Sequence, residues 1–314
     1  RRDIMRVEIN KHEALSTLLR KRVDTITLTN NQGMSMKMLT YGCLMMELNV
    51  PDYSGISENI LMTYDAIESY VKNPLYLNST IGINAGRMER GQVKVDGKLY
   101  QTEINEGVSN LHGGTKGLHK RVWKYTGETI GTNWCSVSLK YEHIHLSDGF
   151  PGNMTIEAEF RLNDDNQLLV KYTTIPDRDC HINFTNHYYF NLSGNERRQI
   201  DEHLLFVNAL YYKEIDENGL PVEPKIQVKN TTFDFSQFTP IENAYRSEQS
   251  GIDHPFSIED PIDHTKPNIV YRDPVSKRSL SIVSNQPCAV IYTNNVMHKN
   301  HMGICFETQQ FPNT

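Results

Sequence analysis

The segment from Thr185 to Gly194 combines residue types that could perform acid–base chemistry. It reads Thr-Asn-His-Tyr-Tyr-Phe-Asn-Leu-Ser-Gly and places one imidazole, His187, among aromatic and amide side chains. Histidine has the unperturbed side-chain pKa nearest neutrality, so it gives or takes a proton readily. Aromatic faces and amides suit a flat polar ligand such as a sugar. A half-buried strand with an incidental histidine would contain the same residues, so this segment alone does not decide between the two.

A second candidate is Glu307, which directly follows the apolar residues 304–306. A carboxylate next to an apolar run is unusual, because the cost of removing it from water must be compensated. Burial of this kind raises the pKa of a glutamate toward the range that is useful for a general base. Glu307 is therefore a candidate base.

Three further candidates lie beside glycines. Arg87 follows Gly86, His112 precedes the pair 113–114, and Asp253 comes shortly after a glycine in the segment Gly-Ile-Asp-His. Glycine lets a backbone approach a ligand closely, and arginine supplies planar hydrogen-bond donors. These three residues could hold a polar ligand. A solvated arginine and a carboxylate that caps a turn remain open as alternatives.

Histidine spacing gives little support for a metal site. His143 and His145 are two residues apart, and His298 and His301 are three apart, but the chain has 12 histidines, so such coincidences are expected. No cysteine–histidine set has the spacing of a zinc finger. The sequence also lacks a phosphate-binding loop, a dinucleotide fingerprint and a Gly-x-Ser-x-Gly elbow. We predict neither a metal nor a cofactor.

The hydrophobic pattern predicts the elements that must position these side chains. Regular short runs of alternating residues separated by turn signals favour an all-β sandwich or barrel. We expect a short amphipathic helix within 8–22 and another over 65–72, capped by Asp65. The composition changes nowhere in the manner of a linker, so we expect a single domain over 1–314. The clearest strands are expected at 25–29, 35–39, 93–95, 136–141, 155–162, 168–174, 203–207 and 279–283.

Composition limits the classes of function. The net charge is −6 and the longest basic run is Arg20-Lys21-Arg22, so nucleic-acid binding has no electrostatic support. Five dispersed cysteines are typical of a reducing compartment. No apolar run is long enough to span a membrane, and the first residues lack the apolar segment of a signal peptide. These features predict a cytoplasmic protein without a membrane partner.

Taken together and in this order, the motifs resemble those of the aldose 1-epimerase (galactose mutarotase) family. The resemblance runs from about Thr25 to the last residue. Any one piece is weak, whereas the ordered set is specific. The pieces are Ala85-Gly86-Arg87 with Val93 to Gly97, Leu111-His112-Gly113-Gly114, Ser147-Asp148-Gly149-Phe150-Pro151-Gly152-Asn153, Thr185 to Gly194, Phe233-Asp234-Phe235, Gly251-Ile252-Asp253-His254, Tyr292-Thr293-Asn294, and Phe306-Glu307-Thr308-Gln309 followed by Phe311-Pro312.

The resemblance implies a fold, a reaction and a role for each candidate. The fold would be a single-domain β-supersandwich with an open cleft and no cofactor, and the reaction would interconvert the α and β anomers of a free aldohexose such as galactose or glucose. The family's base falls on Glu307 and its acid on His187. His112 would bond near the reacting oxygens, and Arg87 and Asp253 would hold sugar hydroxyls. We expect a monosaccharide as the partner of a monomer or homodimer.

Two departures from the family pattern bear on these expectations. Val290 stands where many members carry Gln, which removes one possible sugar contact. The chain also ends at Thr314, soon after Glu307, where members usually continue with further strand-forming residues. Either the sequence omits a tail or the Glu307 side of the cleft is less supported.

Three other functions remain open from the residues. The fold could carry a carbohydrate-binding protein that has lost catalysis, although the presence of both Glu307 and His187 speaks against it. A sugar-phosphate epimerase would need a basic cluster near the cleft. A glycoside hydrolase could use Glu307 and Asp253 as its carboxylate pair.

Overall fold

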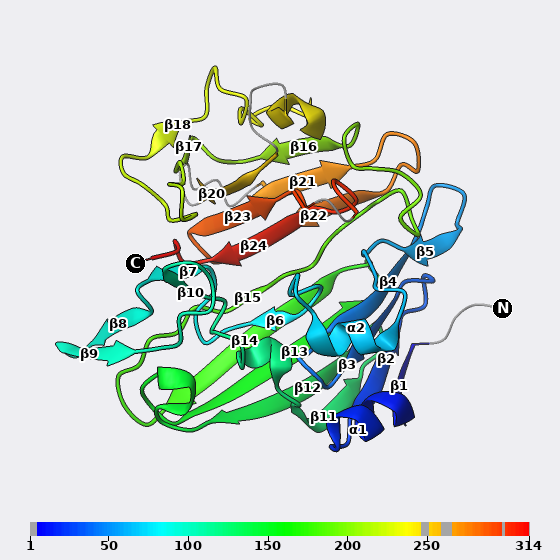
Figure 1. The fold of residues 1–314 in the computed structure, drawn as a ribbon. Helices are drawn as coiled ribbons and strands as arrows, with labels where there is room; N and C mark the ends of the chain where they lie inside the picture. The colour runs from blue at the N-terminus through cyan, green and yellow to red at the C-terminus, as the bar shows by residue number, and fades with distance from the viewer. Residues whose placement is uncertain (1–4, 246–250, 259–265, 297–298, 314) are drawn as a thin grey trace.

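The computed structural model describes residues 5–245, 251–258, 266–296 and 299–313, and most of its regular structure is antiparallel β-sheet (Figure 1). The N-terminal and C-terminal halves of the chain form two groups of sheets, drawn at the bottom and the top of the figure. Two short helices flank the N-terminal group. They are α1 (Glu13–Leu19) and α2 (Ile67–Lys72).

The N-terminal group contains a five-stranded and a four-stranded sheet. The first has the order β1-β2-β3-β4-β5 and the second the order β11-β12-β13-β14. The bounds are β1 (Arg6–Lys11), β2 (Asp24–Thr29), β3 (Ser35–Leu39), β4 (Met45–Pro51), β5 (Ser57–Asn59), β11 (Lys124–Ile130), β12 (Trp134–His143), β13 (Met154–Asn163) and β14 (Leu168–Pro176).

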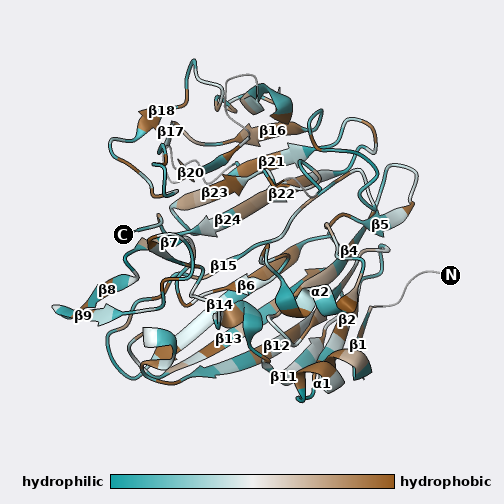
Figure 2. Ribbon diagram, viewed as in Figure 1, coloured by the Kyte–Doolittle hydropathy of each residue, from teal (hydrophilic) through white to brown (hydrophobic). Residues whose placement is uncertain are grey.

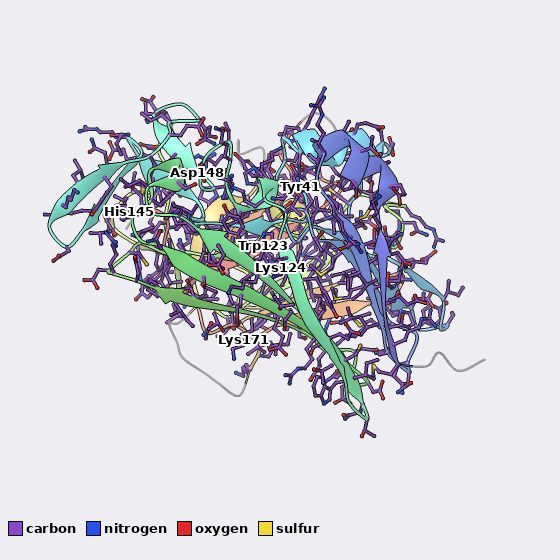
Figure 3. The ribbon with its side chains drawn as sticks, turned by 90° about the horizontal axis from the view of Figure 1, so that it is seen from below. Tyr41, Trp123, Lys124, His145, Asp148 and Lys171 are labelled. Carbon is purple, nitrogen blue, oxygen red and sulfur yellow. The ribbon has the colours of Figure 1, made fainter. Side chains whose placement is uncertain are left out.

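Strand β13 shows why this sequence forms sheet. Its side chains alternate between buried and partly or fully exposed along the whole strand, as a period of two requires. Met154, Ile156 and Phe160 are almost completely buried on one face. Exposed lysines occupy other strands of the same sheet, and Figure 3 labels Lys124 of β11 and Lys171 of β14 among them. One face of this sheet therefore packs on the core while the other meets water.

The C-terminal group contains a four-stranded and a five-stranded sheet, with orders β19-β16-β21-β22 and β18-β17-β20-β23-β24. Their bounds are β16 (Leu204–Val207), β17 (Tyr211–Tyr212), β18 (Ile226–Gln227), β19 (Thr239–Pro240), β20 (Asp253–Ser257), β21 (Ile269–Arg272), β22 (Ser279–Ile282), β23 (Cys288–Tyr292) and β24 (Cys305–Gln309).

Three two-stranded ribbons complete the sheet structure. Two of them, β7 with β10 and β6 with β15, lie between the two groups of sheets in Figure 1, while β8 with β9 projects to one side. Their bounds are β6 (Thr80–Ile81), β7 (Arg87–Glu89), β8 (Gln92–Val95), β9 (Lys98–Gln101), β10 (Ser109–Leu111) and β15 (Thr185–Asn186). Short 3₁₀ turns occur at η1 (Leu118–Lys120), η2 (Ser147–Gly149) and η3 (Ile241–Tyr245).

Two clusters of buried apolar residues fill the interior. The larger joins both groups of sheets, from Met5 to Phe306, and Figure 2 shows hydrophobic residues along β21 and β23 in the upper group. The smaller cluster contains Leu15, Tyr70, Tyr189 and residues near them, and also Cys305. It connects the two helices to the strand that carries Glu307.

The predicted strands are confirmed, with ends shifted by a few residues. The predicted short helix within 8–22 is confirmed as α1, and residues 6–11 before it form β1, which pairs in full register with β2. The side chain of His12 then caps α1 by accepting from Leu15 N. The predicted cap at Asp65 is wrong: Ala66 is the N-cap residue of α2 and makes no side-chain cap hydrogen bond. The expectation of a single domain remains a prediction.

Candidate active site

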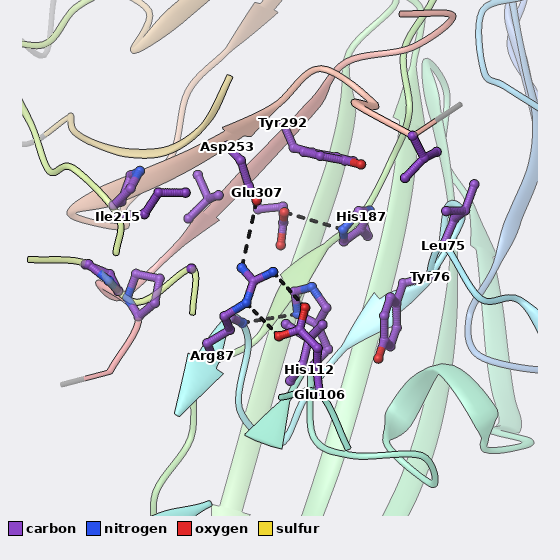
Figure 4. Close-up of a pocket in the computed structure, with 18 of the residues that line it drawn as sticks. Leu75, Tyr76, Arg87, Glu106, His112, His187, Ile215, Asp253, Tyr292 and Glu307 are labelled. Atoms are coloured by element: carbon purple, nitrogen blue, oxygen red, sulfur yellow. Dashed lines mark hydrogen bonds and ion pairs between the residues drawn. The ribbon is translucent and has the colours of Figure 1, made fainter. Parts of the chain in front are cut away.

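A cavity of about 220 Å³ lies between β20, β23 and β24 on one side and the two central ribbons on the other (Figure 4). All five side chains singled out from the sequence line it: Arg87, His112, His187, Asp253 and Glu307. The sequence separates them by as many as 220 positions, from Arg87 to Glu307 (307 − 87). The fold thus brings the whole predicted set into one site.

Arg87 and His112 are held by the same ribbon. Arg87 is the first residue of β7 and pairs with Leu111 of β10, so His112 comes next in the chain. Residue 112 has a φ of +55°, and Gly113 follows with +83°. A Cβ added to Gly113 would lie 2.2 Å from the carbonyl oxygen of Gly82, so only glycine fits at that point. The Gly-Gly motif turns the chain sharply and aims the imidazole into the cavity.

Asp253 and Glu307 come from one face of the five-stranded sheet. Asp253 begins β20, and Glu307 is the central residue of β24. The strand between them, β23, pairs Val290 with Glu307 and Tyr292 with Asp253. Side chains two residues apart on a strand share a face, so this face carries both carboxyl groups and both of these neighbours into the cavity. Val290, the departure noted above, is thus a cavity residue beside Glu307.

His187 reaches the cavity from the end of β15. Its backbone is fixed on both sides, because His187 N donates to Ser79 O and His187 O accepts from Asn78 N. The ring Nε2 lies 3.5 Å from Glu307 Oε1. Both side chains are buried, with 6% of His187 and 4% of Glu307 exposed. Among the described residues, Glu307 Oε2 has no hydrogen-bond partner, so it is available to a ligand.

Burial moves the pKa values of these two residues in opposite directions. It raises the pKa of Glu307 to about 8, with a further increase from Asp253 and an opposing effect from Arg87. It lowers the pKa of His187 to about 4. Both shifts follow from the cost of charge in a poorly solvated site, which disfavours the ionised forms of each group. Near neutral pH the resting pair is therefore a protonated Glu307 beside a neutral His187.

Arg87 is oriented by a residue that the sequence did not single out. Its Nε and Nη2 donate to the two carboxylate oxygens of Glu106 at 2.7 and 2.9 Å, and its Nη1 lies 3.9 Å from Asp253 Oδ2. Gly219 covers the guanidinium, since a Cβ there would lie 2.7 Å from Arg87 Cζ. The two-pronged pair with Glu106 fixes the plane of the guanidinium. Glu106 is six residues before His112 and reaches the site because β7 and β10 pair.

Aromatic rings surround the two histidines of the site. The ring of Tyr76 makes edge contacts with His112 and with His119, at 4.7 Å between centroids in both cases. Tyr189 lies 5.0 Å and Tyr292 6.4 Å from the ring of His187. Tyr76 has a φ of +54°, which no sequence pattern indicates for a tyrosine. These rings pack against the imidazoles of the site.

The three buried groups His112, His187 and Glu307 are close enough to be considered for a metal ion, with candidate ligand atoms within 4.8 Å of one another. The hydrogen bonding of His112 argues against this use. Gly86 N donates to His112 Nδ1 at 3.1 Å, so the neutral ring carries its proton on Nε2, the nitrogen left for the cavity. A ligating histidine instead donates its second N–H to an acceptor. His112 is thus arranged as a hydrogen-bond donor to a ligand, and the prediction of no metal stands as a prediction.

The other spaced histidines serve separate local contacts. His143 Nε2 lies 3.2 Å from Phe150 O, and His145 Nδ1 accepts from Gly152 N. His301 pairs with Asp201 and stacks on a tyrosine. His298 lies outside the described residues.

Comparison with known protein families shows to which family the chain belongs. The family model described as aldose 1-epimerase matches residues 24–314. The chain belongs to the aldose 1-epimerase family. An aldose 1-epimerase from Haemophilus influenzae is 30% identical over 304 residues, which cover 92% of this chain and 87% of the relative. A galactose mutarotase from Homo sapiens is 28% identical, covering 88% of this chain and 82% of the relative.

Solved structures of the aldose 1-epimerase family have the same fold. The crystal structure of galactose 1-epimerase from Lactobacillus acidophilus superimposes with a TM-score of 0.87 at 28% identity, covering 98% of this chain and 91% of that one. An aldose epimerase homologue from C. elegans gives a TM-score of 0.83 at 25% identity, covering 92% of this chain and 90% of that one. The expectation of an all-β, mutarotase-like sandwich is confirmed.

Proposed function

We propose that this protein is an aldose 1-epimerase that interconverts the α and β anomers of free aldohexoses such as galactose or glucose. The observation that carries the proposal is the buried pair of Glu307 and His187, with Nε2 and Oε1 3.5 Å apart in a cavity sized for one sugar ring. Opening the ring requires one proton to leave the C1 hydroxyl and another to reach the ring oxygen, so it needs a base and an acid. The family and its relatives support the same reaction.

The proposed mechanism assigns Glu307 as the base and His187 as the acid. Glu307 takes the proton of the C1 hydroxyl while His187 gives a proton to O5, so the C1–O5 bond breaks and an aldehyde forms. Rotation about C1–C2 presents the other face of the carbonyl group. Reclosure returns the proton from O5 to His187 and the proton from Glu307 to the oxygen on C1. No covalent bond to the protein forms in this sequence.

The other three residues hold the sugar. His112 donates from Nε2 near the reacting oxygens, while Arg87 and Asp253 bind hydroxyl groups. Because Glu106 already accepts hydrogen bonds from Nε and Nη2 of the guanidinium, Arg87 offers Nη1 as its main remaining donor. Such contacts place C1 between the acid and the base, and orientation of this kind contributes a large part of catalysis.

The proposed roles require the Glu307–His187 pair to hold one dissociable proton. In the ring-opening step Glu307 gains one proton and His187 loses one. The pair therefore holds one dissociable proton both before and after this step. A protonated glutamic acid beside a neutral imidazole contains the same number of protons as a carboxylate beside an imidazolium. The resting state can therefore interconvert with the reactive state across 3.5 Å, and the two residues titrate as a unit.

We accordingly expect kcat/KM for galactose to be flat between about pH 4 and about pH 8. Above about 8 the pair loses its proton and has no acid, and below about 4 it gains a second proton and has no base. The titratable groups around the pair are those of His112, Arg87, Glu106, Asp253 and Cys305, together with the surrounding tyrosines. Polarimetry with subtraction of the uncatalysed rate at each pH measures the profile. A single limb centred near pH 6.5 would contradict the shared-proton scheme.

The direct test of the function is the optical rotation of freshly dissolved α-D-galactose and α-D-glucose, with and without the protein. An aldose 1-epimerase accelerates relaxation to the same final rotation, and the two initial rates rank the sugars. Folded protein that accelerates neither sugar would overturn the proposal in favour of a binding role. Release of sugar from a methyl galactoside would instead indicate a hydrolase.

The alternative of a sugar-phosphate epimerase meets an electrostatic obstacle. Among the described residues that line the cavity, the carboxyl groups of Glu106, Asp253 and Glu307 face one guanidinium, Arg87, and no lysine. Lys213 and Lys225 lie near, but they pack on Phe311 and bond to Glu223 and Ser257. A phosphate in the cavity would meet acidic groups and an arginine that is already paired.

We therefore expect Glu106→Gln to weaken the discrimination against phosphate. Removing the charge of Glu106 leaves the positive charge of Arg87 less neutralised. The inhibition constant of galactose 6-phosphate should therefore be about 5- to 10-fold lower in the variant than in wild type, which this compound should inhibit weakly. Inhibition constants from polarimetry measure the effect. Glu103→Gln is the matched control, because Glu103 accepts hydrogen bonds from Thr115 and does not line the cavity. Equal inhibition of both variants would show that Glu106 does not set this preference.

A cytoplasmic location and a monomer or homodimer complete the proposal. None of the cysteines, all of which lie in the described part of the chain, joins another in a disulfide, which supports a reducing compartment. The helices that the structure describes are too short and polar to cross a membrane.

A further inference from the structure

The nitrogen of His187 that faces away from Glu307 contacts a cysteine. Cys305 Sγ lies 3.4 Å from His187 Nδ1, within hydrogen-bond reach for sulfur. Cys305 is completely buried and precedes Glu307 by two residues in β24, so both side chains lie on the same face of the strand. The two nitrogens of one imidazole are thus held by two residues of one strand.

The shared-proton scheme dictates where the protons of the ring must lie. In the resting pair, protonated Glu307 donates to Nε2, so Nε2 carries no proton and the neutral ring carries its proton on Nδ1. In the reactive pair, the imidazolium carries a proton on both nitrogens. Nδ1–H is therefore present in both states, and it needs an acceptor in a site that excludes water.

The side-chain contact of Nδ1 is the sulfur of Cys305. The backbone carbonyl of His187 also interacts with the ring, but it already accepts from Asn78 N at 2.9 Å. The thiol stays protonated because burial raises the pKa of Cys305 well above its usual value. Its sulfur lone pairs remain able to accept the Nδ1 proton, although weakly.

We propose that Cys305 is a positioning residue for catalysis, whose sulfur accepts the Nδ1–H of His187 and so reserves Nε2 for proton exchange with Glu307 and the sugar. This inference rests on the proposed function for its kinetic consequence. The tautomer that it specifies is a property of the protein without substrate. The two can therefore be tested separately.

The choice of sulfur has a physical consequence. A carboxylate at this position would stabilise the imidazolium and trap the proton on His187, as it does where a histidine must become charged. A neutral, weak acceptor fixes the orientation of the ring without such a bias. The proton then remains available to either member of the pair, which suits a reaction that must run in both directions.

Two substitutions separate positioning from packing. Cys305→Ala removes the acceptor and should lower kcat for galactose about 10- to 100-fold with an unchanged KM, a size typical of residues that orient a functional histidine. Cys305→Ser restores an acceptor and should recover most of the loss. Cys43→Ala is the matched control, because Cys43 is also completely buried but bonds to Thr80, whereas Cys305 contacts His187. It should leave kcat unchanged.

Nitrogen NMR of ¹⁵N-histidine-labelled protein without sugar reads the tautomer directly. In wild type and Cys305→Ser, His187 should show a protonated Nδ1 and an unprotonated Nε2, and in Cys305→Ala a mixture of tautomers. Wild type with the proton on Nε2, or Cys305→Ala with wild-type kcat, would overturn the inference. If Cys305→Ala fails to fold, the wild-type spectrum still decides it. An inactive wild type with the expected tautomer would refute the proposed function and leave the positioning intact.

Discussion

Glu307→Gln should reduce anomer exchange by about 10³–10⁴-fold while sugar binding survives. The amide keeps the size of the side chain but cannot take the proton from the C1 hydroxyl, and each well-placed proton transfer contributes roughly 10²–10⁴-fold. Binding should persist because Arg87, His112 and Asp253 still line the cavity. Polarimetry gives the rate, and calorimetric titration with galactose gives the affinity. Turnover equal to wild type would remove Glu307 from the role of base.

The stability of the same variant provides an independent check on the state of Glu307. Its pKa of about 8 in the folded protein exceeds the value of 4.5 for a free glutamate, so folding favours the protonated form. The stability from this group is fully present below about pH 4.5 and is lost as the pH rises through about 8. Glutamine never ionises, so the variant should match wild type at pH 4 and exceed it at pH 9 by up to about 5 kcal/mol. Urea unfolding at both pH values measures the difference. A variant less stable than wild type at pH 9 would contradict the assigned burial effect.

His187→Asn should lower kcat by about 10²–10³-fold, with a smaller change in KM. Asparagine can still donate a hydrogen bond toward O5, but it cannot transfer a proton, so the acid step is lost and part of the polarisation stays. The alkaline limb of the pH profile should also change, because Glu307 then titrates without its partner. Rates across pH 5 to 9 test both points.

A suitable control for this variant is His143→Asn. His143 is as buried as His187, but it bonds to a backbone carbonyl away from the cavity. Loss of stability from removing a buried imidazole would appear in both variants, whereas loss of turnover should appear only at position 187. An unchanged rate in His187→Asn would remove its role as the acid.

The sequence by itself predicted the fold class and five of the side chains that line the cavity. The alternation of apolar and polar residues in β13 indicates a strand of a sheet that packs on the core with one face. This period of two can be recognised in the sequence without knowledge of the fold. The candidate residues could be found because titratable side chains lie next to glycines or apolar runs, as for His112 and Glu307. Local chemistry and motif order were enough for this step.

The bounds of the first helix and the cap of the second depend on interactions that a local pattern does not show. The residues before Glu13 form β1, which gains six paired positions with β2. Asp65 has the right residue type for a cap, but the helix begins two residues later. The type of a side chain limits where a helix can begin, and pairing with the surrounding sheet determines where it does begin.

Only the tertiary structure shows which side chains contact one another in the site. Glu106 reaches Arg87 through pairing of two short strands, Cys305 reaches His187 across two separate segments, and the 3.5 Å contact joins residues 187 and 307. The pKa values of that pair depend on burial, which is set by every segment that surrounds the cavity. The sequence identifies the groups that can titrate, whereas the distances between them and their exclusion from water determine which of them are protonated.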